Sequence, residues 1–131
     1  MKKGQMIAKS LVGFGCLLVL TGAALHMLVA YPKVSAALAT SNLNAELQNA
    51  LRAVFFMIGE AWIVLAILAL VGALTETHIR KPVVLICGLA LLLELPTWVH
   101  LMGWFIGNEI LAIAGSLIVV GGLLFHNRSA V

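Results

Sequence analysis

Hydrophobic positions gather in four long runs that are separated by short polar segments. The runs cover about residues 11–31, 53–74, 82–102 and 109–125. An α-helix rises about 1.5 Å per residue, so about 20 residues cross the hydrocarbon core of a bilayer. Lipid offers no partner for backbone N–H and C=O groups, so each run is expected to be helical. The pattern predicts an all-α fold, a four-helix transmembrane bundle that forms one polytopic domain over residues 1–131.

The polar segments predict how the helices connect. Residues 75–82 form a short polar turn, and Pro82 suits the first turn of the helix that follows it. Residues 32–52 predict a longer loop, in which Ser41 and Asn42 offer a helix N-cap. Leu43, Leu47 and Leu51 then follow at helical spacing. We expect the second helix to begin as an amphipathic segment outside the membrane.

Composition excludes several classes of protein. Hydrophobic residues make up 63% of the 131 residues and charged residues 10%, whereas soluble domains average about 45–50% and about 25%. The mean hydropathy is +1.12. A soluble globular domain, a disordered segment and a disulfide-stapled secreted module are therefore excluded, and the length suits one domain.

The basic residues predict the orientation of the bundle. Two of the eight, Lys33 and Arg52, fall on one side of the four runs. The other six fall on the opposite side: Lys2, Lys3, Lys9, Arg80, Lys81 and Arg128. Positive charge concentrates on the cytoplasmic side of membrane proteins, so both termini are expected there, in a multi-pass protein of the inner membrane. No basic cluster is interleaved with aromatic residues, so no nucleic-acid partner is expected.

A cleaved signal peptide is the alternative interpretation of the N-terminus. Residues 1–3 resemble the basic start of such a peptide, and Ala37 and Ala39 have the small-x-small spacing of a cleavage site. The first apolar run nevertheless exceeds the usual 7–15 residues of a signal peptide. We therefore expect the first helix to remain in the protein.

Polar residues inside the apolar runs are the main functional signal. A carboxylate near the bilayer centre costs about 2.5–3.5 kcal/mol or more, so such residues usually face the interior of a bundle. From a rise of 1.5 Å per residue, Glu109 is expected at the outer surface, and His26 and His100 about 6–8 Å below it. Glu60 is then about 12 Å deep and Glu94 about 15 Å deep. These five residues all belong to the outer half of the bilayer.

We expect four of these residues to converge on one cavity. Two carboxyl groups at similar depth reduce their cost by sharing a proton or a partner. Pro96 lacks an N–H and is expected to open its helix, so that Thr97 and His100 also reach the cavity. The convergent residues are Glu60, Glu94, His26 and His100.

This cluster fits several kinds of chemistry. The leading prediction is a pocket for a small lipophilic ligand beneath aromatic side chains. Alternatively, Glu60 or Glu94 is the acid or base of an intramembrane enzyme. A metal ion or a b-type haem held by His26 and His100, a proton-coupled transporter and a purely structural hydrogen-bond network are further alternatives. The predicted ligand-binding residues are His26, Glu60, Glu94, Thr97, Trp98, His100 and Glu109.

One stretch resembles a family of membrane proteins. It comprises Gly59-Glu60-Ala61-Trp62-Ile63-Val64-Leu65, then Leu70-Val71-Gly72, a basic turn and a third run ending in His100. Over about residues 53–101 the chain resembles DoxX-like small bacterial membrane proteins. The resemblance implies a four-helix membrane fold, which in some members is a subunit of a quinone-linked oxidoreductase. An accessory role in a membrane redox complex is therefore also expected. Another membrane protein and a second copy of the chain are the candidate protein partners.

Overall fold

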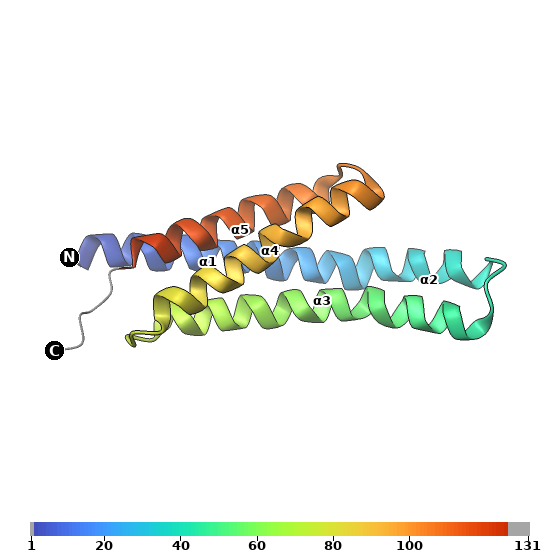
Figure 1. Ribbon diagram of the computed structural model, residues 1–131, viewed down its shortest axis with the longest axis horizontal. Coiled ribbons are helices and arrows are strands. Elements are labelled where there is room, and N and C mark those ends of the chain that lie inside the picture. The colour runs from blue at the N-terminus through green and yellow to red at the C-terminus, as the bar shows by residue number, and fades with distance from the viewer. Residues whose placement is uncertain (1, 126–131) are drawn as a thin grey trace.

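The computed structural model describes residues 2–125, with side chains from residue 3 (Figure 1). All its regular elements are helices, which confirms the all-α prediction. Four helices in this part of the chain are long and apolar enough to cross a membrane. In chain order, the elements are α1 (Lys2–Leu25), the π-helical turn η1 (His26–Ala30), α2 (Tyr31–Ala39), α3 (Ala45–Leu74), α4 (Arg80–Met102) and α5 (Ile106–Leu124).

The first hairpin is longer than predicted. α1, η1 and α2 are continuous. The apolar span within them, Lys3–Ala39, has 37 residues, which corresponds to about 55 Å. The predicted loop is therefore wrong over residues 32–39, where helix continues to Ala39. The predicted early start of the second helix is confirmed, because α3 begins at Ala45. The predicted cap is also displaced. The Ser41 hydroxyl donates to the carbonyl of Leu38 (2.7 Å) at the end of α2, and the Asn44 side chain accepts from the N–H of Leu47 (2.8 Å) at the start of α3.

The helices pack in a ring. α1 packs against α3 and α5, and α4 packs against the same two helices. Figure 1 shows the start of α1, the α3–α4 turn and the end of α5 at one end of the bundle, which we call the closed end. At the other end, which we call the open end, the α2–α3 hairpin projects beyond the α4–α5 turn, and α4 and α5 lean away from α3.

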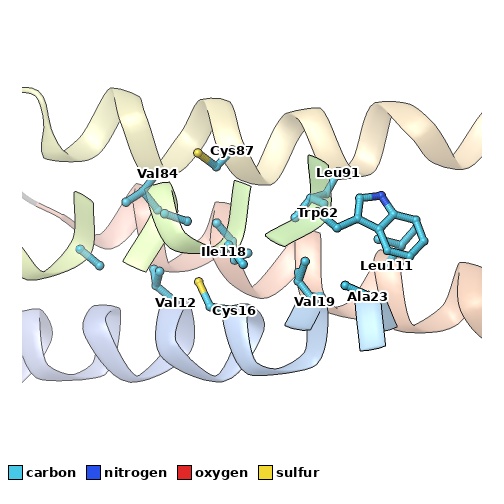
Figure 2. Close-up of a cluster of buried hydrophobic side chains, with 14 of the residues drawn as sticks. Val12, Cys16, Val19, Ala23, Trp62, Val84, Cys87, Leu91, Leu111 and Ile118 are labelled. Atoms are coloured by element: carbon cyan, nitrogen blue, oxygen red, sulfur yellow. The ribbon is translucent and has the colours of Figure 1, made fainter. Parts of the chain in front are cut away.

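The core is built from small and medium side chains. Figure 2 shows Cys16 and Val19 of α1 facing Cys87 and Leu91 of α4, with Ile118 of α5 between them. Both cysteines are free. Close approach of α1 and α5 depends on Gly15, because a Cβ there would lie 2.9 Å from the carbonyl oxygen of Ala114 and 2.7 Å from Cγ1 of Ile118.

A buried arginine, Arg80, lies at the closed end. Arg80 is only 4% exposed, and its guanidinium lies 4.3 Å from the ring centre of Phe125. Its Nη1 donates to the carbonyl of Thr75 at 3.5 Å. Arg80 therefore joins the α3–α4 turn to the end of α5 through a cation–π contact.

Pro96 does not break α4. The helix continues from Arg80 to Met102 with Pro96 inside it, so the predicted opening is wrong. One missing backbone hydrogen bond is tolerated in a helix whose neighbours hold it in place. α4 ends instead at Gly103, whose φ of 74° suits glycine. The Asn108 side chain donates to the Gly103 carbonyl (2.9 Å) and closes the turn into α5.

Candidate functional site: an apolar cavity at the open end

The divergence of the helices at the open end leaves a cavity of about 370 Å³. Its size lies within the range of small-molecule sites, about 300–1,000 Å³. All the membrane-length helices contribute to its wall, together with η1 and α2. The lining residues are Val19, Gly22, Leu25, His26, Val29, Ala30, Lys33, Val34, Phe55, Trp62, Trp98, Met102, Phe105, Ile106, Gly107, Ile110 and Leu111. Most of these side chains are apolar or aromatic.

The π-helical turn begins at His26 and forms part of this wall. The N–H of Tyr31 donates to the carbonyl of His26, five residues earlier, which is the π pattern. Pro32 has no N–H for the carbonyl of Leu28, so a regular α-turn cannot be completed at this point. The wider turn places His26, Val29 and Ala30 along the cavity.

His26 is held by α3. Its Nε2 lies 2.7 Å from the backbone carbonyl oxygen of Phe55, and its ring stacks on that of Phe55 at 4.0 Å with an interplanar angle of 14°. A carbonyl oxygen accepts only, so Nε2 donates the proton. In the neutral imidazole Nδ1 is then an acceptor. His26 therefore contributes to the cavity wall a ring whose position is fixed by α3.

Glu94 lies behind the aromatic wall. Its Oε2 accepts from Nε1 of Trp62 at 2.8 Å and from Nε1 of Trp98 at 3.4 Å. Both tryptophans line the cavity, so their polar edges are engaged by Glu94. A carboxyl that accepts two indole N–H groups fixes the positions of both rings, one from α3 and one from α4.

The predicted convergence of four polar residues is only half realised. His26 lines the cavity and Glu94 supports it, but Glu60 and His100 are exposed and are not among the lining residues. Thr97 is likewise exposed on α4. The physical reason is that Pro96 leaves α4 intact, so the turn containing Thr97 and His100 keeps its outward direction.

The remaining predicted residue, Glu109, lies beside the α4–α5 turn. It is exposed, and its Oε1 accepts from Nε1 of Trp104 at 3.1 Å. Trp98, in contrast, forms part of the cavity wall. The predicted ligand-binding set is therefore divided between the cavity and the outer surface of the bundle.

The geometry does not favour a metal or haem site. Residues 2–125 contain no group of three or more His, Cys, Asp or Glu side chains that could hold a metal ion. His26 donates to Phe55, and His100 is exposed outside the cavity. Catalytic roles for Glu60 and Glu94 stay predictions, and these two carboxyl groups do not share the cavity.

Sequence reasoning missed part of the wall. Phe55 and Trp62 are seven residues apart and so lie on one face of α3, a signal that was present in the sequence. Lys33 was assigned to orientation alone, yet it is also a lining residue. Met102 and Phe105 carry no comparable signal, because their position depends on how far α4 leans from α3.

No protein family, curated protein or solved structure matches this chain. The resemblance of residues 53–101 to DoxX-like proteins therefore stays a prediction.

Proposed function

We propose that this chain is a multi-pass inner-membrane protein that binds a small lipophilic ligand in the cavity at the outer end of its bundle. The observation that carries the proposal is an apolar, aromatic-walled cavity of about 370 Å³ beside the fixed ring of His26. Sites with a mostly apolar wall and few polar groups suit lipophilic molecules.

The distribution of charge supports the membrane orientation. Lys3, Lys9, Arg80 and Lys81 lie in the closed-end segments, and Lys33 and Arg52 lie in the open-end hairpin. Arg128 lies outside the described residues. By the positive-inside rule the closed end faces the cytoplasm, and the cavity then belongs to the outer half of the membrane.

The polar groups of the cavity define the ligand class. The Nδ1 atom of His26 suits a ligand hydroxyl or amide N–H. Lys33 is exposed at the cavity wall and attracts an anionic group. The indole N–H groups of Trp62 and Trp98 are occupied by Glu94, so the rings offer faces for apolar or aromatic contact. The ligand is therefore an apolar molecule with a single polar end.

Fluorescent probe binding tests this proposal. The anionic aromatic probe 1-anilinonaphthalene-8-sulfonate is titrated into protein in lipid nanodiscs, and energy transfer from Trp62 and Trp98 is measured in a Trp104→Phe background. Gly22→Leu should fill the cavity and weaken binding at least tenfold, because Gly22 is a lining residue.

Gly13→Leu is the matched control, because a Cβ at Gly13 meets nothing within 4 Å. Its binding curve should match that of the parent. Equal probe binding by the Gly22→Leu and Gly13→Leu variants would overturn the cavity as the site.

Lys33→Gln separates the anionic contribution from the apolar one. One ion pair in water at about 4 Å is worth about 1 kcal/mol, so binding of the sulfonate probe should weaken about fivefold. The uncharged probe N-phenyl-1-naphthylamine should bind equally to both forms.

Topology is tested by reporter fusions at Ser41 and after Val131, which should report opposite sides of the membrane.

A further inference from the structure

Glu60 lies on the outward face of the longest single α-helix. Trp62, Ala66 and Ala69 of α3 face the core, and Glu60 lies on the opposite side, where it is exposed. The outward stripe that contains it has alternating spacings of four and three residues. Its members are Ala53, Met57, Glu60, Val64, Ile67 and Val71, all exposed.

The depth of Glu60 makes its exposure costly. It lies five residues beyond Phe55, which the contact with His26 places at the cavity, and 14 residues before the end of α3 at Leu74. At 1.5 Å per residue these separations correspond to about 8 Å and about 21 Å. In the proposed membrane orientation the carboxyl therefore lies in hydrocarbon, where it costs about 2.5–3.5 kcal/mol or more without a partner.

We propose that this stripe of α3 is the interface with a second copy of the chain, in which the two Glu60 carboxyls hydrogen bond to each other. A two-fold axis along the membrane normal places every residue of α3 opposite its own counterpart at the same depth. Each Glu60 therefore finds a polar partner at the required level. A protonated carboxyl donates its O–H and the other carboxyl accepts, so two groups that share a proton satisfy each other.

The pattern of the stripe supports helix pairing. Alternating spacings of three and four residues are those of the seam between two paired helices, and one polar residue at a seam position fixes register and oligomeric state. Ala53 is small, and Met57 (61% exposed) and Val64 (54% exposed) flank Glu60 by three and four residues. These side chains have no partner among the described residues of their own copy that covers them.

Disulfide trapping in native membranes tests the interface, which rests on the proposed membrane assignment. Met57→Cys and Val64→Cys should each give a disulfide-linked dimer on mild oxidation, because paired seam positions approach within disulfide reach. Leu93→Cys is the control, since Leu93 is 74% exposed on α4 and off the stripe. It should stay monomeric, as should the parent with buried Cys16 and Cys87. Equal trapping of all three variants, or trapping to a different protein, would overturn the proposal.

Substitution of Glu60 distinguishes an interface from a lipid-exposed face. Energy transfer between labelled copies in vesicles measures dimerisation as lipid dilutes the protein. Glu60→Gln keeps a donor and an acceptor and should dimerise within about threefold of the parent. Glu60→Leu should weaken dimerisation at least tenfold, although it is more apolar. If Glu60→Leu dimerises as well as the parent, or if the parent is monomeric, the proposal is wrong.

Carbonate extraction separates failure of this proposal from failure of the membrane assignment. Every variant should remain in the carbonate-washed membrane fraction. A parent chain that is retained but monomeric overturns the dimer alone. A parent chain released by carbonate overturns the membrane assignment and the dimer with it.

Discussion

The helices pack closely at the closed end of this bundle and leave a cavity at the open end. At the closed end, small residues bring the backbones together, and the buried Arg80 lies against Phe125. At the open end, aromatic residues such as Phe55, Trp62 and Trp98 hold the helices apart around a cavity. Close backbone contact at small residues therefore accompanies the solid end of the bundle, and large aromatic side chains accompany the end that contains the cavity.

Polar groups follow the same division. At the closed end a cation is satisfied by an aromatic face and a backbone carbonyl. At the open end a carboxyl is satisfied by two indole N–H groups, and His26 by the backbone of Phe55. The open-end contacts position rings around empty volume, so they are the ones whose loss should alter binding as well as stability.

The largest expected effect comes from adding one methyl group where α1 meets α5. Gly15→Ala places a Cβ 2.7 Å from Ile118 and 2.9 Å from the backbone oxygen of Ala114, which should cost about 1–3 kcal/mol. Gly22→Ala, on the same helix at the cavity, meets only Ile110 at 3.3 Å and should be nearly neutral. Melting temperatures in detergent compare the two, with Gly13→Ala as the surface control. Equal destabilisation by Gly15→Ala and Gly22→Ala would show that α1 and α5 do not pack more tightly at Gly15 than at the cavity.

Loss of the buried cation should come next. Arg80→Ala removes a desolvated cation–π contact, worth about 2 kcal/mol, together with the packing of its aliphatic stem. Arg52→Ala at the open-end hairpin removes half-exposed contacts to Asn49 and to the carbonyl of Ser35, and should cost less than about 1 kcal/mol. Chemical denaturation in mixed micelles measures both. A greater loss for Arg52→Ala would contradict the role of Arg80 at the closed end.

The two tryptophans of the cavity wall, Trp62 and Trp98, should contribute differently to stability. Trp62→Phe removes the 2.8 Å hydrogen bond to Glu94, and Trp98→Phe removes the 3.4 Å one. The shorter bond should contribute about 1 kcal/mol and the longer one less. Thermal unfolding gives the stability change, and probe titration shows whether the ring that remains still lines the cavity. If Trp98→Phe destabilises more than Trp62→Phe, the order of the two hydrogen bonds is wrong.

The most localised effect is expected at the tip of the hairpin. Asn44→Ala removes the side-chain cap of α3, which should lower the local stability of its first turn by about 1 kcal/mol. Hydrogen exchange should accelerate in the first turn of α3 and stay unchanged at the closed end. Asn42→Ala is the control, because Asn42 makes no side-chain hydrogen bond to any described residue. Faster exchange throughout α3 would show that the hairpin is not an independent extension of the open end.

The apolar runs alone predict an all-α fold with four helices of membrane-spanning length. Runs of apolar residues longer than a bilayer crossing leave no alternative to helix, and the structure confirms four of sufficient length. Of the polar residues that the sequence singled out within these runs, His26 lines the cavity and Glu94 contacts two tryptophans of its wall. The length of the first hairpin was not predicted, because the first apolar run ends at residue 31, whereas the π-helical turn before Pro32 lets helix continue to Ala39.

The packing of the helices against one another sets which way the polar side chains point. A helix that is apolar on all sides has no pattern that distinguishes its inner face from its outer face. Glu60 and Glu94 therefore read alike in the sequence, yet Glu94 meets two tryptophans while Glu60 faces outward. The sequence predicts a pocket, but its lining depends on how α4 leans from α3, which brings Met102 and Phe105 into the wall.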